Sequence, residues 1–338
     1  MGYNFKVSAS DSCSVHRYTD IQAYDLNSTH GYGSVATLRP VTKFGMFPSE
    51  DYCYPPINLN TYVSSSDTVT ISWSPGDSSS SVFALAYKTD AEEEWTVEND
   101  EITDTSYILT SLLPYTKYNI KLWTVCPNGN SFSQYQSFIT QPNDGCFIYL
   151  TYEEDFDDLG NLSPWRYTHI GGNKWHVGPA VNNTRDIEGF FTEGNALYIS
   201  NDGGLTNSYN NAETSTSHFS TLITITDSVY YGISFDYKLI GDGYSDNLSV
   251  YLVPLYQELT TSTNGFISLG TLTNTQNTWR RFEKAIPQSL SAGVYQLVFT
   301  WNNNNYNGEN PPAAIDNLRV QASMCAIPTG ISATVSDI

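Results

Sequence analysis

The segment Leu113-Pro114-Tyr115-Thr116-Lys117-Tyr118 decides the fold of the residues on either side of it. It joins two runs in which apolar and polar residues alternate, 106–109 and 118–125. A tyrosine at such a corner buries its ring while its hydroxyl satisfies a backbone group of the turn. Further alternating runs surround the corner, at 68–74, 82–88, 94–97 and 135–140. About seven short strands between Cys53 and Gln141 therefore predict two packed antiparallel sheets.

This span resembles a fibronectin type III domain, which is an immunoglobulin-like sandwich, over residues 51–142. Trp73 stands where that family has its core tryptophan, Tyr87 where it has an aromatic residue on the next strand, and Tyr118 where it has the corner tyrosine. The resemblance implies that Tyr118 has a structural role. The sequence contains no Arg-Gly-Asp tripeptide, and the span indicates no chemistry of its own.

A second, larger β domain is predicted for residues 143–323. Its apolar runs lie between turn clusters, at 147–152, 196–200, 221–226, 230–237, 247–252, 279–286, 294–301 and 313–320. A segment of this length with long loops fits a jelly roll, in which two antiparallel sheets pack face to face. We therefore expect an all-β protein, an immunoglobulin-like sandwich followed by a larger jelly-roll β-sandwich.

The larger segment also resembles the jelly-roll family that includes eukaryotic MAM domains and the cleaved adhesin domains of gingipain-type bacterial surface proteins. The resemblance rests on an ordered set of short pieces: Asp155-Phe156-Asp157 on a first strand, Trp165 and Trp175 in the loop after it, 194–204, 234–238, Trp279, 299–301 and 311–318. The disulfide cysteines usual in MAM domains are missing, and Pro164 precedes Trp165 where relatives have cysteine. These two departures favour the bacterial branch.

Composition and charge limit the kinds of partner that this protein can bind and the compartment in which it is found. Of 338 residues, 35 are Asp or Glu and 15 are Lys or Arg, which gives a formal net charge of -20. A surface this acidic repels phosphate, so we expect no binding to nucleic acid. No stretch approaches the roughly 18 apolar residues that a membrane helix needs, so we expect no membrane insertion. Aromatic residues reach 14% and charged residues only 15%. Such a chain can bury a core and is typical of secreted β proteins.

Both ends of the sequence suggest neighbouring modules. Residues 1–50 are expected to be the C-terminal strands of a preceding β module or a linker. The start of 324–338, Cys325-Ala326-Ile327-Pro328, resembles Cys53-Tyr54-Pro55-Pro56, so we expect a further fibronectin type III-like module to begin there. The apolar alternation runs to Ile338 as if a strand were cut, which suggests a fragment of a longer surface protein.

The five cysteines are odd in number and widely spaced, with no C-x-x-C pair: Cys13, Cys53, Cys126, Cys146 and Cys325. This pattern argues against structural zinc and against a disulfide-dense scaffold. The sequence leaves their pairing open.

Acidic residues after position 152 raise the question of calcium. Asp155, Asp157, Asp158 and Gly160 begin like an EF-hand loop, but Leu159 and Arg166 stand where oxygen ligands are required, which excludes that motif. The jelly-roll resemblance instead implies a Ca²⁺ site built from separate segments by Asp155, Asp157, Asp202 and Asp316. The alternative is that these residues cap turns and accept from backbone amides.

The remaining residues raise two kinds of ligand chemistry, sugar binding and glycoside hydrolysis. Aromatic residues stand beside Asn, Asp and Gly in predicted loops, as in sugar-binding sandwiches, although a two-sheet core would consume many of them: Trp165, Tyr167, Trp175, Phe190, Phe191, Tyr209, Tyr244, Tyr256 and Tyr306. We assign Trp165, Trp175 and Trp301 to the core. Consecutive acids at 153–155 would point to opposite faces of a strand, so they cannot flank one glycosidic bond.

The sequence thus predicts a monomeric, non-catalytic adhesion or ligand-binding module of a bacterial surface or secreted protein, with a glycan or an extracellular protein as ligand. No nucleophile with an adjacent base is legible, so we expect no enzymatic activity. The alternative is that these are accessory domains of a secreted peptidase or glycoside hydrolase whose catalytic domain lies outside the chain. The neighbouring coding sequence would distinguish the two.

Overall fold

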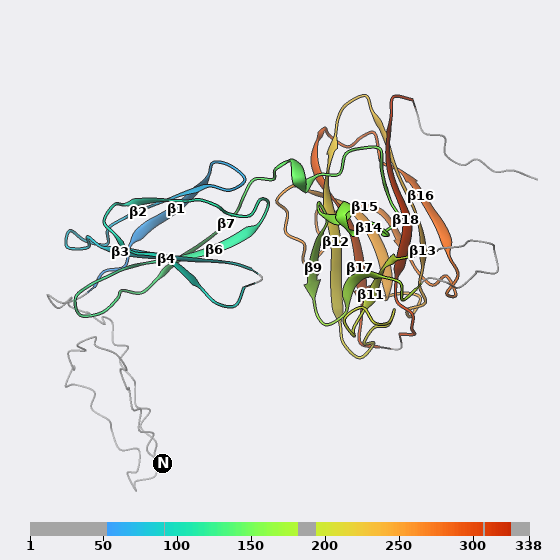
Figure 1. The fold of residues 1–338 in the computed structure, drawn as a ribbon, viewed down its shortest axis with the longest axis horizontal. Helices are drawn as coiled ribbons and strands as arrows, with labels where there is room; N and C mark the ends of the chain where they lie inside the picture. Colours follow the sequence, from blue (N-terminus) through green and yellow to red (C-terminus); the bar gives the residue numbers. More distant parts are fainter. Residues whose placement is uncertain (1–52, 91, 182–193, 307, 326–338) are drawn as a thin grey trace, which may run out of the picture. The chain divides into compact units, whose positions relative to one another are not determined.

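The computed structural model describes residues 53–90, 92–181, 194–306 and 308–325. The chain divides into two compact units between Gln141 and Pro142, and both are drawn in Figure 1. The modules predicted for 1–50 and for most of 324–338 lie outside the described residues. In the described part of the chain, no helix is long and apolar enough to span a membrane.

The smaller unit consists of two antiparallel sheets. One has the order β1-β2-β5, and the other has the order β4-β3-β6-β7. Their bounds are β1 Ile57–Val63, β2 Val69–Ser74, β3 Phe83–Thr89, β4 Thr96–Ile102, β5 Ser106–Leu109, β6 Lys117–Thr124 and β7 Gln134–Ile139. At nearly every strand end, the predicted and observed bounds differ by two residues or fewer. The largest difference is at the end of β4, which runs five residues beyond the predicted strand.

Alternation along the strands produces the core of this unit. On β2, Val69, Ile71 and Trp73 are buried while the residues between them are more exposed. Trp73 meets Phe83 of the facing sheet edge to face, with ring centroids 5.4 Å apart. Each fully buried apolar side chain of this size contributes roughly 1.5–3 kcal/mol, so a few such contacts between the sheets hold the sandwich together.

The larger unit is a second sandwich. One sheet has the order β10-β11-β18-β13-β16, with β8 added beside β18, and the other has the order β15-β14-β17-β12-β9. The strands are β8 Tyr152–Glu154, β9 Arg166–Ile170, β10 Lys174–Gly178, β11 Ala196–Ser200, β12 Ser215–Ile225, β13 Tyr230–Lys238, β14 Asn247–Pro254, β15 Ile267–Leu272, β16 Arg280–Ala285, β17 Gly293–Asn303 and β18 Ala314–Ser323. Two short 3-10 helices precede and follow β8, η1 Asp144–Cys146 and η2 Leu159–Leu162.

Aromatic residues fill the space between these two sheets. Trp165 stacks on Phe219 of β12 with centroids 4.3 Å apart, and Phe235 of β13 meets Phe299 of β17 edge to face at 5.2 Å. Trp165, Trp175 and Trp301 are all buried, as the sequence predicts. The all-β class with two sandwiches of unequal size is confirmed.

The strand predicted at 147–152 is wrong. Phe147 makes a single parallel bridge to Leu222, and the strand itself begins only at Tyr152. Phe156 has φ 64°, in the left-handed region, so the chain leaves the sheet there. Asp155 and Asp157 therefore follow β8 instead of lying on it. The sequence also missed β9, β10 and β15, and with them the place of Trp175, which lies on β10 and not in a loop.

Candidate functional site

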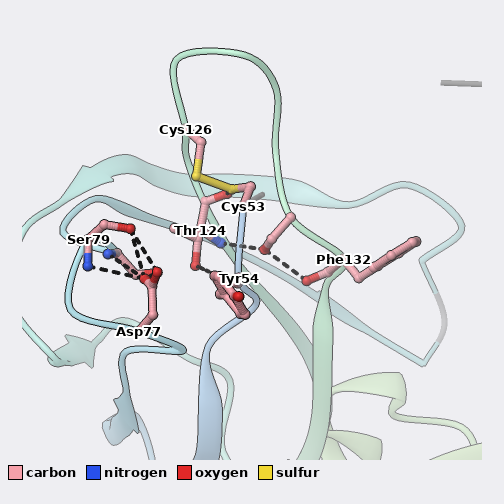
Figure 2. Close-up of a disulfide and its surroundings, with 9 residues drawn as sticks. Cys53, Tyr54, Asp77, Ser79, Thr124, Cys126 and Phe132 are labelled. Carbon is pink, nitrogen blue, oxygen red and sulfur yellow. Dashed lines mark hydrogen bonds between the residues drawn. A yellow bond between two sulfur atoms is a disulfide. The ribbon is translucent and has the colours of Figure 1, made fainter. Parts of the chain in front are cut away.

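A disulfide joins Cys53, just before β1, to Cys126, just after β6, across 73 residues of sequence. Figure 2 shows the bond beside Thr124, whose hydroxyl donates to the carbonyl of Tyr54 at 2.7 Å. The pair closes the end of the smaller unit where its first strand begins. Disulfides persist in oxidising compartments, so this bond indicates an extracellular protein.

Tyr118 occupies the corner that the sequence assigns to it. Its ring is buried against Phe138, with the two rings stacked at 5.7 Å. The backbone N–H of Leu113 donates to the Tyr118 hydroxyl oxygen at 2.9 Å. The tyrosine therefore satisfies a turn amide that the strand ladder leaves over, and the role is structural.

Asp316 is the most deeply buried of the four predicted metal ligands, with 2% of its surface exposed. It lies on β18 directly opposite Asp236 of β13. Burial, together with the negative charges of Asp236, Asp157 and Asp155, raises the pKa of Asp316 to about 7. Asp236 has its own partners, because Arg281 Nη1 donates to it at 3.1 Å and Asn317 Nδ2 at 2.9 Å.

Asp155 and Asp157 lie near Asp316 because the chain turns after β8. The backbone N–H of Asn195 donates to Asp157 Oδ1 at 2.7 Å, which ties this turn to the start of β11. Gly194 has φ 85°, and a β-carbon there would collide with the Asp157 carboxylate. The sequence Gly194-Asn195 is therefore what lets β11 begin beside Asp157.

Asp202 lies elsewhere and accepts hydrogen bonds within its own turn. The hydroxyls of Ser200 and Thr206 donate to it at 2.6 Å each, and the N–H groups of Leu205 and Thr206 at 3.0 Å each. These bonds lower the pKa of Asp202 to about 2, and the bond from Ser200 has the largest effect. The charge of Asp202 acts on His176 and Tyr198, whereas the charges that act on Asp316 are Asp236, Asp157 and Asp155.

The predicted calcium set is therefore only partly assembled. Asp155, Asp157 and Asp316 share one acidic region, to which the structure adds Asp236, a residue that the sequence did not single out. Asp202 does not join them and has the turn-capping role that was the alternative for it. Within 53–90, 92–181, 194–306 and 308–325, no three Asp, Glu, His or Cys side chains form a metal-holding group.

The aromatic residues predicted in loops separate into two kinds. Trp165, Trp175 and Tyr209 are buried, and Phe190 and Phe191 lie outside the described residues. Tyr167 and Tyr256 are partly exposed. Tyr244 is 88% exposed and Tyr306 68% exposed, which makes them the two strongest candidates for contact with a ligand.

Tyr244 and Tyr306 stand on two loops that one carboxylate holds together. Asp242 Oδ1 accepts from the N–H groups of Tyr244, Ser245 and Asp246 at 2.7–2.8 Å. Asn304 Nδ2 donates to the other oxygen of Asp242 at 3.4 Å. Asn304 Oδ1 in turn accepts from the N–H of Tyr306 at 2.7 Å. Asp242 and Asn304 thus fix both tyrosine backbones relative to each other.

A buried carboxylate beneath these loops completes the anchor. Asp246 is fully buried and accepts from the Tyr209 hydroxyl at 2.5 Å and from the Asn304 N–H at 3.0 Å. Burial raises the pKa of Asp246. Any side chain at Gly308 would collide with Tyr209 and Asp246, and Gly241 pairs with Glu309 as an isolated bridge. The sequence signal for this arrangement is Asp242-Gly243-Tyr244-Ser245-Asp246, which none of the predictions from the sequence includes.

Comparisons with known proteins identify the smaller unit. The family model of the fibronectin type III domain matches residues 54–140. Residues 54–140 form a fibronectin type III domain. A larger all-β sandwich follows it.

Three solved structures are among those similar to this chain. The FN5 domain of Drosophila Lar is 17% identical, with a TM-score of 0.25, over 27% of this chain and 100% of that one. The fn3 domain of the human collagen alpha-1(XX) chain is 20% identical, with a TM-score of 0.27, over 30% of this chain and 96% of that one. FN3tt is 20% identical, with a TM-score of 0.24, over 26% of this chain and 95% of that one. No curated protein matches the chain.

Proposed function

We propose that this chain is a non-catalytic, extracellular adhesion module of a bacterial surface or secreted protein, and that its larger sandwich binds a glycan. The observation that carries the proposal is the pair of exposed tyrosines, Tyr244 and Tyr306, on loops tied together by Asp242 and Asn304. Modules of the fibronectin type III kind are typical of extracellular, non-catalytic proteins. The smaller domain acts as a spacer in this proposal.

The chemistry of the two tyrosines suits a sugar. An aromatic face packs on the C–H groups of a pyranose ring, while neighbouring amides and carboxylates take its hydroxyls. Both loops are already fixed by hydrogen bonds, so ligand binding orders little additional backbone. Asp242 and Asn304 supply polar groups on the same two loops.

Calcium belongs to the same proposal. The resemblance to cleaved adhesin and MAM-like domains implies the ion. Asp155, Asp157 and Asp316 would have to draw together to hold it, because they do not form a metal-holding group as the structure places them. A cation there would offset the repulsion of carboxylates around a buried aspartate and would stabilise the fold. It is not required to touch the glycan.

The test is a glycan array probed with the intact chain, followed by titration of the best glycan. Tyr244→Ala with Tyr306→Ala is expected to weaken binding by about tenfold or more, which corresponds to about 1.4 kcal/mol. Tyr62→Ala, a 71% exposed tyrosine of β1, is the matched control. If no glycan binds, or if the double variant binds as tightly as the wild type, the proposal fails.

The non-catalytic part of the proposal has a separate test. The intact chain is expected to release no product from peptide or glycoside substrates. Turnover that one point mutation abolishes would contradict it and would favour an enzyme.

A further inference from the structure

The outward face of the β4-β3-β6-β7 sheet carries an organised set of aromatic and basic side chains. On β3 and β6, Leu85, Ile120 and Leu122 point into the core, so the residues between them point outward. The register places Lys121 directly between Ala86 on one side and Tyr135 on the other. This row crosses the three strands β3, β6 and β7.

Two tryptophans stand over this row. The ring of Trp95 lies 6.0 Å from that of Tyr135, measured between centroids. Lys121 Nζ lies 4.9 Å from the Trp95 ring and 5.5 Å from the Trp123 ring. Ala84 and Ala86 are fully buried although they are on the outward face, because large neighbouring side chains cover them.

The three basic residues of 54–141 are Lys88, Lys117 and Lys121, and this segment contains no arginine. All three alternate outward on β3 and β6 of the same sheet. Lys117 forms an ion pair with Asp90 at 3.3 Å, and Lys88 Nζ donates to the carbonyls of Glu92 and Glu93. In an acidic chain, this face gathers the domain's cations.

Lys121 differs from the other two lysines. In the part of the chain that the structure describes, its ammonium contacts the two indole rings and has no hydrogen bond or ion pair. The rings hold it in place by a cation–π interaction, which is compatible with a further anionic partner. Its three N–H groups are therefore available to an acceptor from outside the domain.

We propose that this lysine–aromatic face, formed by Lys88, Trp95, Lys121, Trp123 and Tyr135, binds a glycan that carries carboxylate groups. Tyr135, which is 65% exposed, and Trp95 would pack on sugar rings, and Lys121 would take the carboxylate. The charge favours an acidic glycan, because a carboxylate gives Lys121 a charged acceptor whereas a neutral glycan offers only hydroxyl oxygens. The proposal goes beyond the glycan site of the larger sandwich, since it concerns a different domain and a different ligand chemistry.

A narrow polymer suits this face better than a folded protein. Tyr135 and Val97 are its strongly exposed large apolar residues, while the tryptophans are partly covered. A stable protein interface needs about 800 Å² per partner with a well-packed apolar centre. A single row of rings and ammonium groups across three strands offers a track for one sugar chain.

The test is calorimetric titration of the intact chain carrying Tyr244→Ala and Tyr306→Ala, so that failure here is separate from failure of the proposed function. The probes are tetragalacturonate and α2,8-linked tetrasialic acid, which distinguish uronic from sialic acids, in about 0.15 M salt. We expect at least one of the two to bind. Its methyl ester should bind about tenfold more weakly or not at all, because the ester removes the charge.

Variants of the face provide the second readout. Lys121→Gln and Tyr135→Ala are each expected to weaken binding by about tenfold, while Lys121→Arg keeps most of it, because arginine retains the cation and stacks on indole. Tyr62→Ala on the opposite sheet is the matched control. The unfolding midpoint of each variant shows that the domain is folded, so a loss of binding reports on the face itself.

Four results would overturn the proposal. They are no binding of either acid at millimolar concentration, equal binding of the acid and its ester, equal binding by Lys121→Gln, and binding only after residues 1–52 are removed. The last result would assign the face to the chain's own N-terminal segment. Capture of a peptide with no binding of the acids would assign it to a protein partner.

Discussion

Tyr118 shows how one hydroxyl can fix a corner of a sandwich. The Leu113 N–H that it accepts comes from the turn before β6, where no strand partner exists. Thr140 assists from the other side, since its hydroxyl donates to the Leu113 carbonyl at 2.7 Å. Both backbone groups of Leu113 are thus satisfied by side chains, which keeps the turn in one conformation.

Replacing Tyr118 by Phe is expected to cost about 1–3 kcal/mol, because the Leu113 N–H loses its acceptor while the ring still fills the core. The midpoint of denaturant unfolding of the fibronectin type III domain measures the change. Tyr62→Phe on exposed β1 is the control and should leave the midpoint unchanged. Equal midpoints for Tyr118→Phe and wild type would contradict the structural role.

His218 is a buried histidine with both ring nitrogens bonded. Its Nε2 lies 3.1 Å from the carbonyl oxygen of Thr260, which can only accept, so Nε2 carries the proton. Its Nδ1 accepts from the Thr300 hydroxyl at 2.9 Å. Burial lowers the pKa of His218 to about 4. Burial also lowers the pKa of His169 to about 4, and a charge on His218 would lower it as well. The folded state therefore contains the His218 ring in its neutral form.

Acid should destabilise the larger sandwich through His218. Between pH 6.5 and pH 4 the unfolded chain binds a proton that the native ring does not, so stability falls as pH falls through this window. The full effect is about 3 kcal/mol for one such group. Unfolding midpoints at several pH values in wild type and in His218→Gln measure it.

Above pH 7 the difference in unfolding midpoint between the two proteins should no longer change with pH if the titration of His218 is responsible. Asp316 opposes this effect, since its raised pKa lets the native state bind a proton first. Asp316→Asn is therefore run alongside. In the Asp316→Asn background stability should fall with acid and His218→Gln should flatten the slope, whereas with Asp316 intact His218→Gln should leave stability rising as pH falls. Parallel slopes would show that His218 contributes nothing.

At the scale of elements, a bulge in β18 sets the position of Asp316. Ser234 pairs with Arg319, but Asp236 pairs with Asp316, so one extra residue stands in β18. Asn317 absorbs it with φ 49° and is exposed, while Leu318 and Ile315 on either side point into the core. The bulge turns the Asp316 carboxylate to the outward face of the sheet, opposite Asp236. Bulges beside functional sites commonly redirect a side chain in this way.

The Cys53–Cys126 bond is the element-scale constraint on the smaller domain. Figure 2 shows it next to the Thr124 and Tyr54 contact that also joins the two segments. Replacing both cysteines by serine is expected to destabilise the domain by about 2–4 kcal/mol, because the unfolded chain gains the freedom of a long loop. Denaturant unfolding with and without reductant measures this.

Reductant should lower the wild-type midpoint and leave the double serine variant unchanged. Cys146→Ser is the control, since Cys146 is a free thiol in the larger unit. If reductant has no effect on wild type, the bond is absent in solution.

At the scale of the whole molecule, calcium is expected to act on one unit and not on the other. Binding to the native state alone stabilises by about 2.7 kcal/mol at a hundredfold excess over the dissociation constant. Chelator should therefore lower the melting temperature of the larger sandwich, and millimolar calcium should restore it. The transition of the fibronectin type III domain should not move.

Two aspartate variants sharpen this prediction. Asp316→Ala should abolish the response to calcium. Asp202→Ala should keep it, because Asp202 is bonded within its own turn. If the wild-type protein melts identically with and without chelator, the proposal that the larger sandwich binds calcium is wrong.

The sequence by itself determined the all-β class, the fibronectin type III domain and its corner tyrosine, and the core roles of Trp165, Trp175 and Trp301. These depend on alternation along single strands and on a turn of six residues, which are local properties of the chain. The strands that it missed, β9, β10 and β15, have only five or six residues each and are edge strands of their sheets, so little alternation marks them.

Only the tertiary structure decided which side chains meet. The pairing of Cys53 with Cys126, the separation of Asp202 from Asp316, the addition of Asp236 and the face of Trp95, Lys121 and Tyr135 all depend on register between strands far apart in sequence. Register follows from the packing of whole sheets and from single irregular residues such as Asn317. A shift of one residue moves every side chain of a strand to the opposite face, and the amino-acid pattern of one strand does not contain that information.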